Sequence, residues 1–204
     1  PAMLEGATGD GDISVARGEG GRPVVDIAWR GELPAAVWSQ LDAQVREQTW
    51  AGARVWLDGA ATPATFGDPR PVFEGADGRP LVVAAGGFAQ PSDEGGALIA
   101  RRAAELVRKS GEALGSIVEL YAGSGTLSIL LAPLTTRFVA VESQEESVRA
   151  ARQNLEARGL EGKVVCADAD AHPPGRADVV VLDPPRTGAK GAAERIAAAA
   201  ARAV

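Results

Sequence analysis

Three short apolar runs in the second half of the chain, each ending in a turn or an acidic residue, constrain the fold most strongly. The runs end at Gly123-Ser124-Gly125, at Glu142 and at Asp183-Pro184-Pro185-Arg186. Helical patterns separate the runs, and strands that alternate with helices predict a parallel sheet with right-handed crossovers. Open sheets of this kind bind ligands at the carboxyl ends of their strands. We therefore expect the chemistry where these three ends meet.

The same alternation predicts an α/β fold with a doubly wound, mostly parallel, Rossmann-like sheet over residues 88–204. Apolar runs predict strands at 117–121, 138–141, 163–167 and 178–182. Periodic or Ala-rich segments predict helices at 93–109, 126–131, 145–158 and 191–204. Ser92 or Asp93 can cap the first of these helices, and Gly159 is the expected end of the third.

Residues 1–87 predict a small α+β region, with a domain boundary near residue 88. Strands are expected at 13–16 and 24–29, joined by a Gly-rich turn at 18–21, and at 53–57 and 80–84. In the helix predicted at 33–48, Val37, Leu41 and Val45 recur at intervals of four and form one buried stripe. Residues 1–12 are expected to lack regular structure. The Pro-, Gly- and Asp-rich segment 59–78 predicts a loop with a short strand near 72–73.

Composition narrows the class of protein and its expected location. The net charge is −6, with the excess of acidic residues in the first half, so neither half has the positive charge of a strong nucleic-acid binder.

No membrane span or secretory signal is visible. The single Cys166 excludes an internal disulfide and a Cys-rich zinc site, and a reducing, cytoplasmic location is expected. The first residue is Pro1 rather than Met, and we expect a partial chain.

A glycine-rich turn between a strand and a helix lets a ligand approach the backbone closely. Gly123 and Gly125 supply this freedom, and the following helix N-terminus adds partial positive charge. Glu142 ends the next strand, where a carboxylate can accept hydrogen bonds from both hydroxyls of a ribose. The alternative for Glu142 is a solvated acid before the helix at 145–158. After a Gly-Ser-Gly turn we favour the ribose contact.

The turn lacks the features of a phosphate site. No basic residue follows it, the Walker A sequence is absent, and Ser128 stands where a dinucleotide site would have its third glycine. The arrangement therefore predicts a nucleoside ligand without phosphates, which indicates S-adenosyl-L-methionine.

Two further acids follow later strands. Asp168 ends the third strand and could accept a hydrogen bond from the exocyclic amine of an adenine, with Asp170 as the competing choice. Asp183 begins an Asp-Pro-Pro-Arg sequence, whose prolines exclude a helix directly after the strand and predict a rigid lip beside the ligand. The alternative for Asp183 is a solvated acid in a rigid turn. The four apolar residues before it favour a position that faces the pocket.

These motifs, together with Phe88-Ala89-Gln90-Pro91, resemble the uracil-C5 RNA methyltransferase family, which forms 5-methyluridine in tRNA or rRNA. The resemblance covers about residues 88–188 and is looser over 13–80. It implies a methyltransferase domain at 88–204, incomplete at its C-terminus, preceded by the family's small central region at 1–87. Beside the turn glycines Gly123 and Gly125, it implies that the cofactor S-adenosyl-L-methionine contacts Gln90, Tyr121, Thr126, Glu142, Asp168 and Asp183.

The sequence departs from the family in several places. Thr126 stands where many members have Asn, and Ala122 where Cys is common. The family's RNA-binding barrel and the Cys cluster of its iron–sulfur members are absent. Without the Cys cluster we expect no metal site, and without the barrel we expect the RNA substrate to be held mostly by segments outside this chain. We also expect a monomer. The family's nucleophilic Cys and its base lie beyond the Asp-Pro-Pro-Arg helix, so this chain would be inactive alone.

Cys166 lies inside an apolar strand and is expected to be a buried small residue.

The chemistry implied by the resemblance explains why a nucleophile is needed. C5 of uracil is weakly nucleophilic, and a thiolate that attacks C6 turns C5 into an enolate carbon able to accept a methyl group. A base then removes the C5 proton and the thiol is eliminated. The target base has to leave its stack to reach the pocket.

Two alternatives stay open. The same domain could methylate cytosine C5 or an exocyclic nitrogen of RNA. Nitrogen methylation often pairs the prolines with a following aromatic residue, and Arg186 stands at that position here. The chain could also be a non-catalytic nucleotide-binding module.

Overall fold

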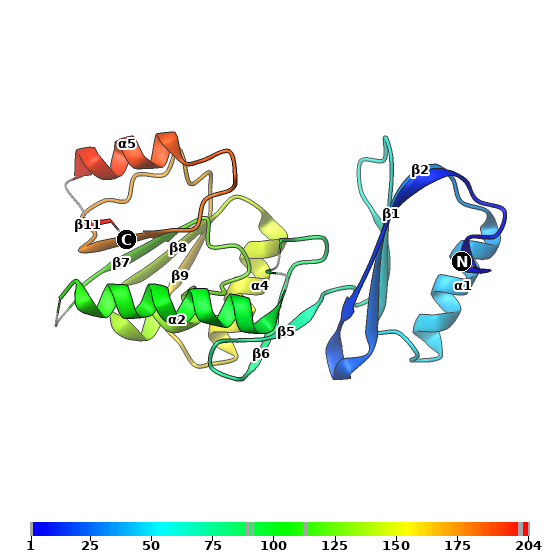
Figure 1. Ribbon diagram of the computed structural model, residues 1–204, viewed down its shortest axis with the longest axis horizontal. Coiled ribbons are helices and arrows are strands. Elements are labelled where there is room, and N and C mark those ends of the chain that lie inside the picture. Colours follow the sequence, from blue (N-terminus) through cyan, green and yellow to red (C-terminus); the bar gives the residue numbers. More distant parts are fainter. Residues whose placement is uncertain (1, 89, 91, 112–113, 200–201, 204) are drawn as a thin grey trace. The chain divides into compact units, whose positions relative to one another are not determined.

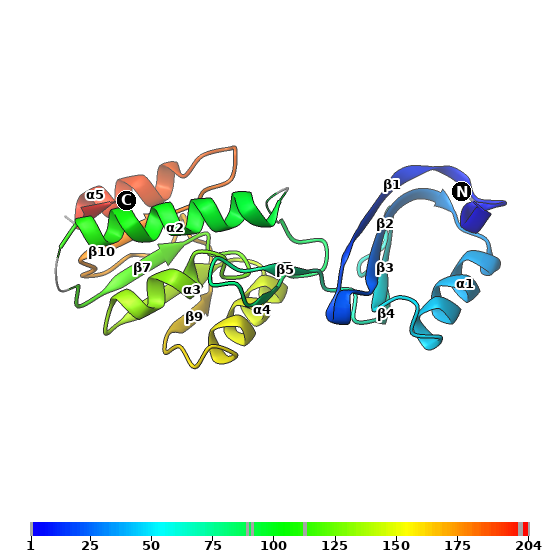
Figure 2. The same ribbon diagram turned by 60° about the horizontal axis from the view of Figure 1, so that its bottom comes forward.

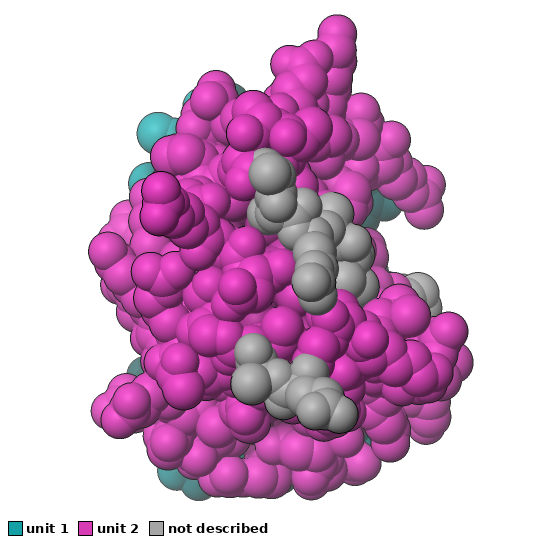
Figure 3. Space-filling model, turned by 90° about the vertical axis from the view of Figure 1, so that its left-hand side faces the viewer, with its two compact units in different colours: residues 1–72 teal, residues 73–204 magenta. Residues whose placement is uncertain are grey.

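A computed structural model describes residues 2–88, 90, 92–111, 114–199 and 202–203 of the chain. Residues 89 and 91 of the motif at 88–91, and three residues of the helix predicted to reach 204, lie outside this described part. The chain divides into two compact units, Pro1–Val72 (unit 1) and Phe73–Val204 (unit 2), which Figure 3 distinguishes by colour. None of the described helices is long and apolar enough to cross a membrane.

In the described part of unit 1, a four-stranded sheet of order β1-β2-β3-β4 packs against one helix (Figure 2). The elements are η1 (Ala2–Leu4), β1 (Thr8–Arg17), η2 (Glu19–Gly21), β2 (Pro23–Glu32), α1 (Ala35–Arg46), β3 (Gly52–Leu57) and β4 (Ala64–Gly67). β1 and β2 form the predicted antiparallel hairpin. β2 and β3 are parallel and are connected through α1, and β4 is antiparallel to β3.

The core of unit 1 lies between the sheet and α1. Val37 and Leu41 are fully buried and pack with Ile27 and Val55 of the sheet. The predicted helical stripe is therefore confirmed at Val37 and Leu41, whereas Val45, near the end of α1, is only half-buried.

Two expectations for unit 1 are wrong. β1 begins at Thr8, inside the segment predicted to lack regular structure, and β4 lies inside the segment predicted to be loop. Gly9 and Gly11 concealed the start of β1, because glycine has a low strand propensity. In the structure a Cβ on these two glycines would lie 1.9 Å and 2.1 Å from carbonyl oxygens of β2. The close approach of the two strands therefore requires glycine there.

The sheet of unit 2 has the order β11-β10-β7-β8-β9, and its described strands are all parallel, which confirms the predicted α/β fold. Its strands are β7 (Ile117–Leu120), β8 (Phe138–Glu142), β9 (Lys163–Cys166), β10 (Val179–Leu182) and β11 (Arg202–Ala203). The last strand lies where the Ala-rich composition predicted helix. It pairs with the edge of β10, whose backbone groups would otherwise be unpaired.

Helices cover both faces of this sheet (Figure 1). α2 (Asp93–Lys109), α3 (Ser128–Leu131) and α4 (Glu145–Glu156) pack on one face, with η3 (Ala132–Leu134) after α3. α5 (Lys190–Ala199) packs on the other face. Ser92 caps α2 as predicted, since its Oγ accepts a hydrogen bond of 3.0 Å from Gly95 N. From β7 the chain runs through β8 and β9 on one side and returns to β10 on the other, so the topological switch point lies at β7.

A small hairpin of β5 (Val72–Glu74) and β6 (Pro80–Val82) packs beside α4. Asn154 of α4 holds it through hydrogen bonds with Val82, and Arg158, just after α4, forms an ion pair with Asp77. The division between the compact units therefore lies at residues 72–73, earlier than the expected boundary near residue 88.

Candidate functional site

A pocket of about 710 Å³ opens in unit 2 at the carboxyl ends of β7, β8 and β10. Its volume is in the range of small-molecule sites. Six of the predicted site residues line it, namely Gln90, Tyr121, Gly123, Thr126, Glu142 and Asp183. Gly125 and Asp168 are not part of this lining. The structure thus brings the ends of three separate strands together at the switch point.

The turn after β7 presents its backbone to the pocket. Gly123 has a φ of +55°, and a Cβ added there would meet no atom within 4 Å, so open space lies beside it. Gly125 has a φ of +91°, and its Cβ would lie 3.4 Å from Ala151 of α4. Gly123 therefore leaves room for a ligand, whereas Gly125 packs the turn against α4.

Glu142 is held rigidly at the end of β8. Its Oε2 accepts a hydrogen bond of 3.0 Å from Gly123 N, and its Oε1 accepts one of 2.8 Å from Gln144 N. The Ser143 hydroxyl donates a further bond of 3.2 Å to Oε1. Glu142 is therefore not simply a solvated acid before α4, because its carboxylate connects the turn after β7 to the end of β8.

Glu119, which the sequence analysis missed, is a buried acid in the pocket wall. It is only 1% exposed, lines the pocket and accepts a hydrogen bond of 2.5 Å from Ser128 Oγ. Burial raises the pKa of its carboxyl to about 8, the Ser128 hydrogen bond opposes the rise, and the charges of Asp183 and Glu142 add to it. A single acid inside the apolar run of β7 was the signal that could have revealed it.

Tyr121 follows β7 in an unusual backbone conformation. Its φ is +61°, a region that non-glycine residues seldom adopt and that is common at functional sites. Its hydroxyl is buried and has no hydrogen-bond partner among the described residues. Burial, and next the nearby carboxylate of Asp170, raise the pKa of Tyr121 to about 12. Tyr121 thus lines the pocket and packs beside the segment that follows β9.

The two acids proposed for the adenine amine lie after β9. Asp168 is exposed and accepts a hydrogen bond of 2.9 Å from Asp170 N. Asp170 Oδ1 accepts one of 2.9 Å from Ala192 N in the first turn of α5. Asp170 is therefore engaged in holding α5, and neither acid lines the pocket.

The Asp-Pro-Pro-Arg segment forms one wall of the pocket. Asp183 follows β10, and burial raises the pKa of its carboxyl although part of the side chain is exposed. Pro184, Pro185 and Arg186 also line the pocket, as does Phe88, which is 81% exposed.

The lining beside α2 brings Gln90 and Thr126 close to each other. A Cβ on Gly96 of α2 would lie 3.6 Å from Gln90 and 3.9 Å from Thr126. Both lining residues therefore lie against the first turns of α2.

The expectation for Cys166 is wrong. Its side chain is exposed, because it is the last residue of β9 at the edge of the described sheet. It does not line the pocket, and its Sγ lies 3.5 Å from the carbonyl oxygen of Ser143.

The electrostatics of the pocket favour a cationic or uncharged ligand. The carboxyl groups of Glu142 and Asp183 line it, and Arg186 is the basic member of the described lining. Glu119 also lines it, but its raised pKa of about 8 leaves it mainly uncharged at neutral pH. Together with the glycine turn at the switch point, these groups give the α/β domain an acidic pocket at the ends of its strands.

Comparison with known families agrees with this class. The family model of the methyltransferase small domain matches residues 82–204, and the chain belongs to this family. A tRNA/tmRNA (uracil-C(5))-methyltransferase of Azoarcus sp. (strain BH72) is 31% identical over 179 residues, which are 77% of this chain and 44% of the relative. An uncharacterized RNA methyltransferase of Gloeobacter violaceus is 40% identical over 89 residues, which are 42% of this chain and 20% of the relative.

A solved structure shares the fold. Pyrococcus abyssi tRNA (uracil-54, C5)-methyltransferase, in complex with S-adenosyl-L-homocysteine, matches with a TM-score of 0.64 at 18% identity, over 90% of this chain and 45% of that chain. The motif resemblance to uracil-C5 RNA methyltransferases and the expected fold class are thus confirmed. The chain spans less than half the length of each of these three relatives.

Proposed function

We propose that this chain is the cofactor-binding part of an S-adenosyl-L-methionine-dependent RNA methyltransferase that modifies C5 of a uridine in tRNA or rRNA. The observation that carries the proposal is the pocket in which Gly123, Glu142 and Asp183 converge from three neighbouring strands. The names of the relatives support RNA as the substrate and C5 of uracil as the target.

The pocket fits a nucleoside cofactor that carries no phosphate. The open space beside Gly123 has room for the adenosine, and the Glu142 carboxylate faces the same space. A carboxylate has about four lone-pair sites. Three of those of Glu142 accept bonds, the longest from Ser143 Oγ, which can rotate away to leave room for ribose hydroxyls. Bound S-adenosyl-L-methionine supplies an electrophilic methyl group on a cationic sulfonium, and the carboxylate of Asp183 suits that positive charge.

The remaining site residues have narrower proposed roles. Gln90, Tyr121 and Thr126 complete the cofactor pocket as lining residues. Gly125 acts by packing the turn against α4. Asp168 would reach the adenine amine only if the ligand extends beyond the lining, toward the end of β9.

The RNA base is proposed to enter past the Asp-Pro-Pro-Arg wall. The exposed ring of Phe88 and the guanidinium of Arg186 both line the pocket, and bases stack on groups of these two kinds. Cys166 lies away from this lining, so we propose that the nucleophilic thiolate comes from a part of the longer protein outside these residues.

Calorimetry on this chain tests the cofactor assignment. S-adenosyl-L-methionine and S-adenosyl-L-homocysteine should each bind with a stoichiometry of one, and ATP should not bind, because the turn has no phosphate-binding cation. A folded chain that binds neither nucleoside would refute the assignment. The uridine target is tested with the longer protein and unmodified tRNA and rRNA, followed by mass spectrometry of the nucleosides. Formation of 5-methylcytidine or of an N-methylated base would contradict it.

A further inference from the structure

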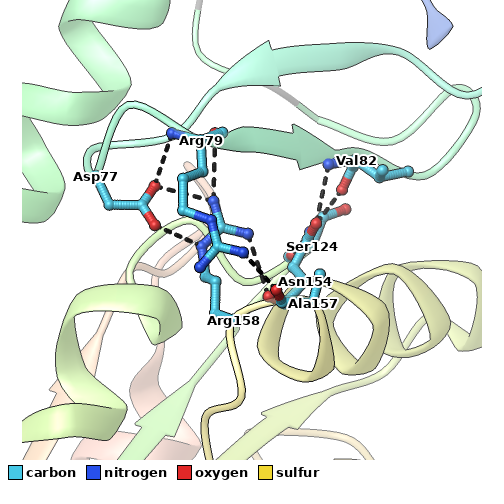
Figure 4. A network of polar contacts seen from close by, with 7 residues as sticks. All are labelled: Asp77, Arg79, Val82, Ser124, Asn154, Ala157 and Arg158. Atoms are coloured by element: carbon cyan, nitrogen blue, oxygen red, sulfur yellow. Dashed lines mark hydrogen bonds and ion pairs between the residues drawn. The ribbon is translucent and has the colours of Figure 1, made fainter.

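Asn154 connects the glycine turn to a distant strand without touching the pocket. It lies on α4 and is 2% exposed. Its Oδ1 accepts a hydrogen bond of 2.9 Å from Val82 N, and its Nδ2 donates bonds of 2.7 Å to Val82 O and 2.8 Å to Ser124 O (Figure 4). The amide of Asn154 thus pairs with the backbone of β6 and holds the carbonyl of the turn at the same time.

The strand that Asn154 holds is anchored independently at its far end. The guanidinium of Arg158 donates two bonds to Asp77, of 2.7 Å and 2.9 Å, and the Arg158 side chain is only 3% exposed (Figure 4). Arg79 donates a bond of 2.5 Å to the carbonyl oxygen of Ala157 at the end of α4. The β5–β6 hairpin is therefore held at two places, by Asn154 of α4 and by Ala157 and Arg158 just after α4. Within the described part of the chain, the place at Asn154 is the one that includes the glycine turn.

Ser124 is the residue through which this restraint reaches the pocket. It lies between Gly123 and Gly125, and glycine adds conformational freedom to a turn. The bond from Gly123 N to Glu142 restrains one side of the turn, and Ser124 restrains the other. Asn154 holds its carbonyl oxygen, and Ala84 N donates a bond of 3.1 Å to its Oγ. Both polar groups of Ser124 that can accept hydrogen bonds are thus fixed from outside the turn.

We propose that Asn154 is a positioning residue, which fixes the Ser124 peptide and thereby holds the Gly123 backbone in the conformation that binds the cofactor. The proposal rests on the proposed function, because it assumes that the pocket beside Gly123 binds S-adenosyl-L-methionine. A turn that is ordered before binding loses less conformational entropy when the ligand enters, so the restraint raises affinity.

Asn154→Asp tests this role with little change in size. The carboxylate places an oxygen where Nδ2 stands, opposite the carbonyl oxygens of Val82 and Ser124, so both donated bonds are lost and the oxygens repel each other. Asn154→Ser is the milder second variant. Its shorter side chain cannot reach Val82 O and Ser124 O, and it adds no charge. Asp77→Asn is the matched control, because it weakens the other anchor of the same hairpin and leaves Ser124 held.

The affinity for S-adenosyl-L-homocysteine is measured by calorimetry on the 204-residue chain, at a temperature where each variant is folded. Asn154→Asp should weaken binding about tenfold or more, since each 1.4 kcal/mol lost corresponds to about tenfold. Asn154→Ser should weaken it less, and Asp77→Asn should lower the melting temperature while changing the dissociation constant by less than about twofold. Unchanged affinity in folded Asn154→Asp, or an equal loss in Asp77→Asn, would overturn the proposal.

Amide hydrogen exchange without any ligand separates this inference from the proposed function. Asn154→Asp should accelerate exchange at the Gly123 and Gly125 amides, and Asp77→Asn should not. If the wild-type chain binds no nucleoside, the cofactor assignment fails, and the exchange pattern still decides whether Asn154 orders the turn. If Asn154→Asp and Asn154→Ser both fail to fold, Asn154 stabilises the whole unit instead, and the positioning role is refuted.

Discussion

Replacing Glu119 by Gln is expected to make the chain more stable at alkaline pH. The carboxyl of Glu119 is buried in β7 and, among the described residues, accepts one hydrogen bond, from Ser128. A buried carboxyl with so few partners favours the protonated form. Gln has nearly the same shape, keeps an oxygen that can accept the Ser128 bond and never ionises.

The magnitude follows from the raised pKa. Burial, with the charges of Asp183 and Glu142, raises the pKa of Glu119 from 4.5 to about 8 against the opposing Ser128 bond. Between these two values the folded state keeps a proton that the unfolded state has lost, so the free energy of unfolding falls as pH rises and is constant above about pH 8. At about 1.4 kcal/mol per pKa unit, the full loss is roughly 5 kcal/mol. This is an upper limit, because water in the pocket can solvate the ionised carboxylate.

Urea unfolding of both proteins from pH 4.5 to 9 measures this effect. The stability difference between Glu119→Gln and wild type should be small near pH 4.5 and should grow steadily in favour of the variant up to about pH 8. Ser128→Ala, with Glu119 kept, is the matched control. It removes the hydrogen bond that lowers the pKa of Glu119, so the fall in its free energy of unfolding should extend to a higher pH than in wild type. A stability difference that does not change with pH would refute the reasoning.

The remaining predictions concern the turn, the ribose contact and the core. Glu142→Ala should weaken binding of S-adenosyl-L-homocysteine by about tenfold or more, because it removes a charged acceptor, and Ser143→Ala should bind at least as tightly as wild type in the same calorimetric titration. Gly125→Ala should lower the melting temperature more than Gly123→Ala does, because a φ of +91° lies far from the left-handed helical value near +57°, which Gly123 at +55° nearly matches. Leu41→Ala, at a fully buried position of α1, should cost about 2–5 kcal/mol in chemical unfolding of unit 1. Equal melting temperatures of the two glycine variants, or an unchanged unfolding midpoint of Leu41→Ala, would contradict these arguments.

The parts of the fold that depend on local patterns were predictable from the sequence. Alternating apolar runs placed β7, β8, β9 and β10 within a residue or two, and Ser92 marked the start of α2. The positions of Glu142 and Asp183 at strand ends followed from the parallel topology alone, because parallel strands present their carboxyl ends at one edge.

Features that depend on long-range pairing were not predictable. The bonds between Asn154 and Val82 join residues that are 72 positions apart, and no periodic pattern indicates them. β11 forms because the edge of β10 accepts it, although its Ala-rich surroundings favour helix. Cys166 lies in an apolar run like those of the inner strands, and only the order of the strands shows that β9 is at the edge.

Glu119 was missed for a different reason. One acid in an apolar run leaves the hydrophobic pattern of the strand unchanged, so the predicted strand is the same with or without it. Its raised pKa arises from burial and from two carboxylates on other strands, which are distant in sequence. The functional meaning of such a residue becomes visible only when the fold brings these groups together.

A crystal structure of this chain with S-adenosyl-L-homocysteine is the most direct test of the proposed site. The ribose hydroxyls should lie within hydrogen-bond distance of the Glu142 carboxylate, with the adenosine beside Gly123 and the sulfur on the side of Asp183. A nucleoside bound elsewhere on the chain, or one in this pocket whose ribose faces away from Glu142, would contradict the account.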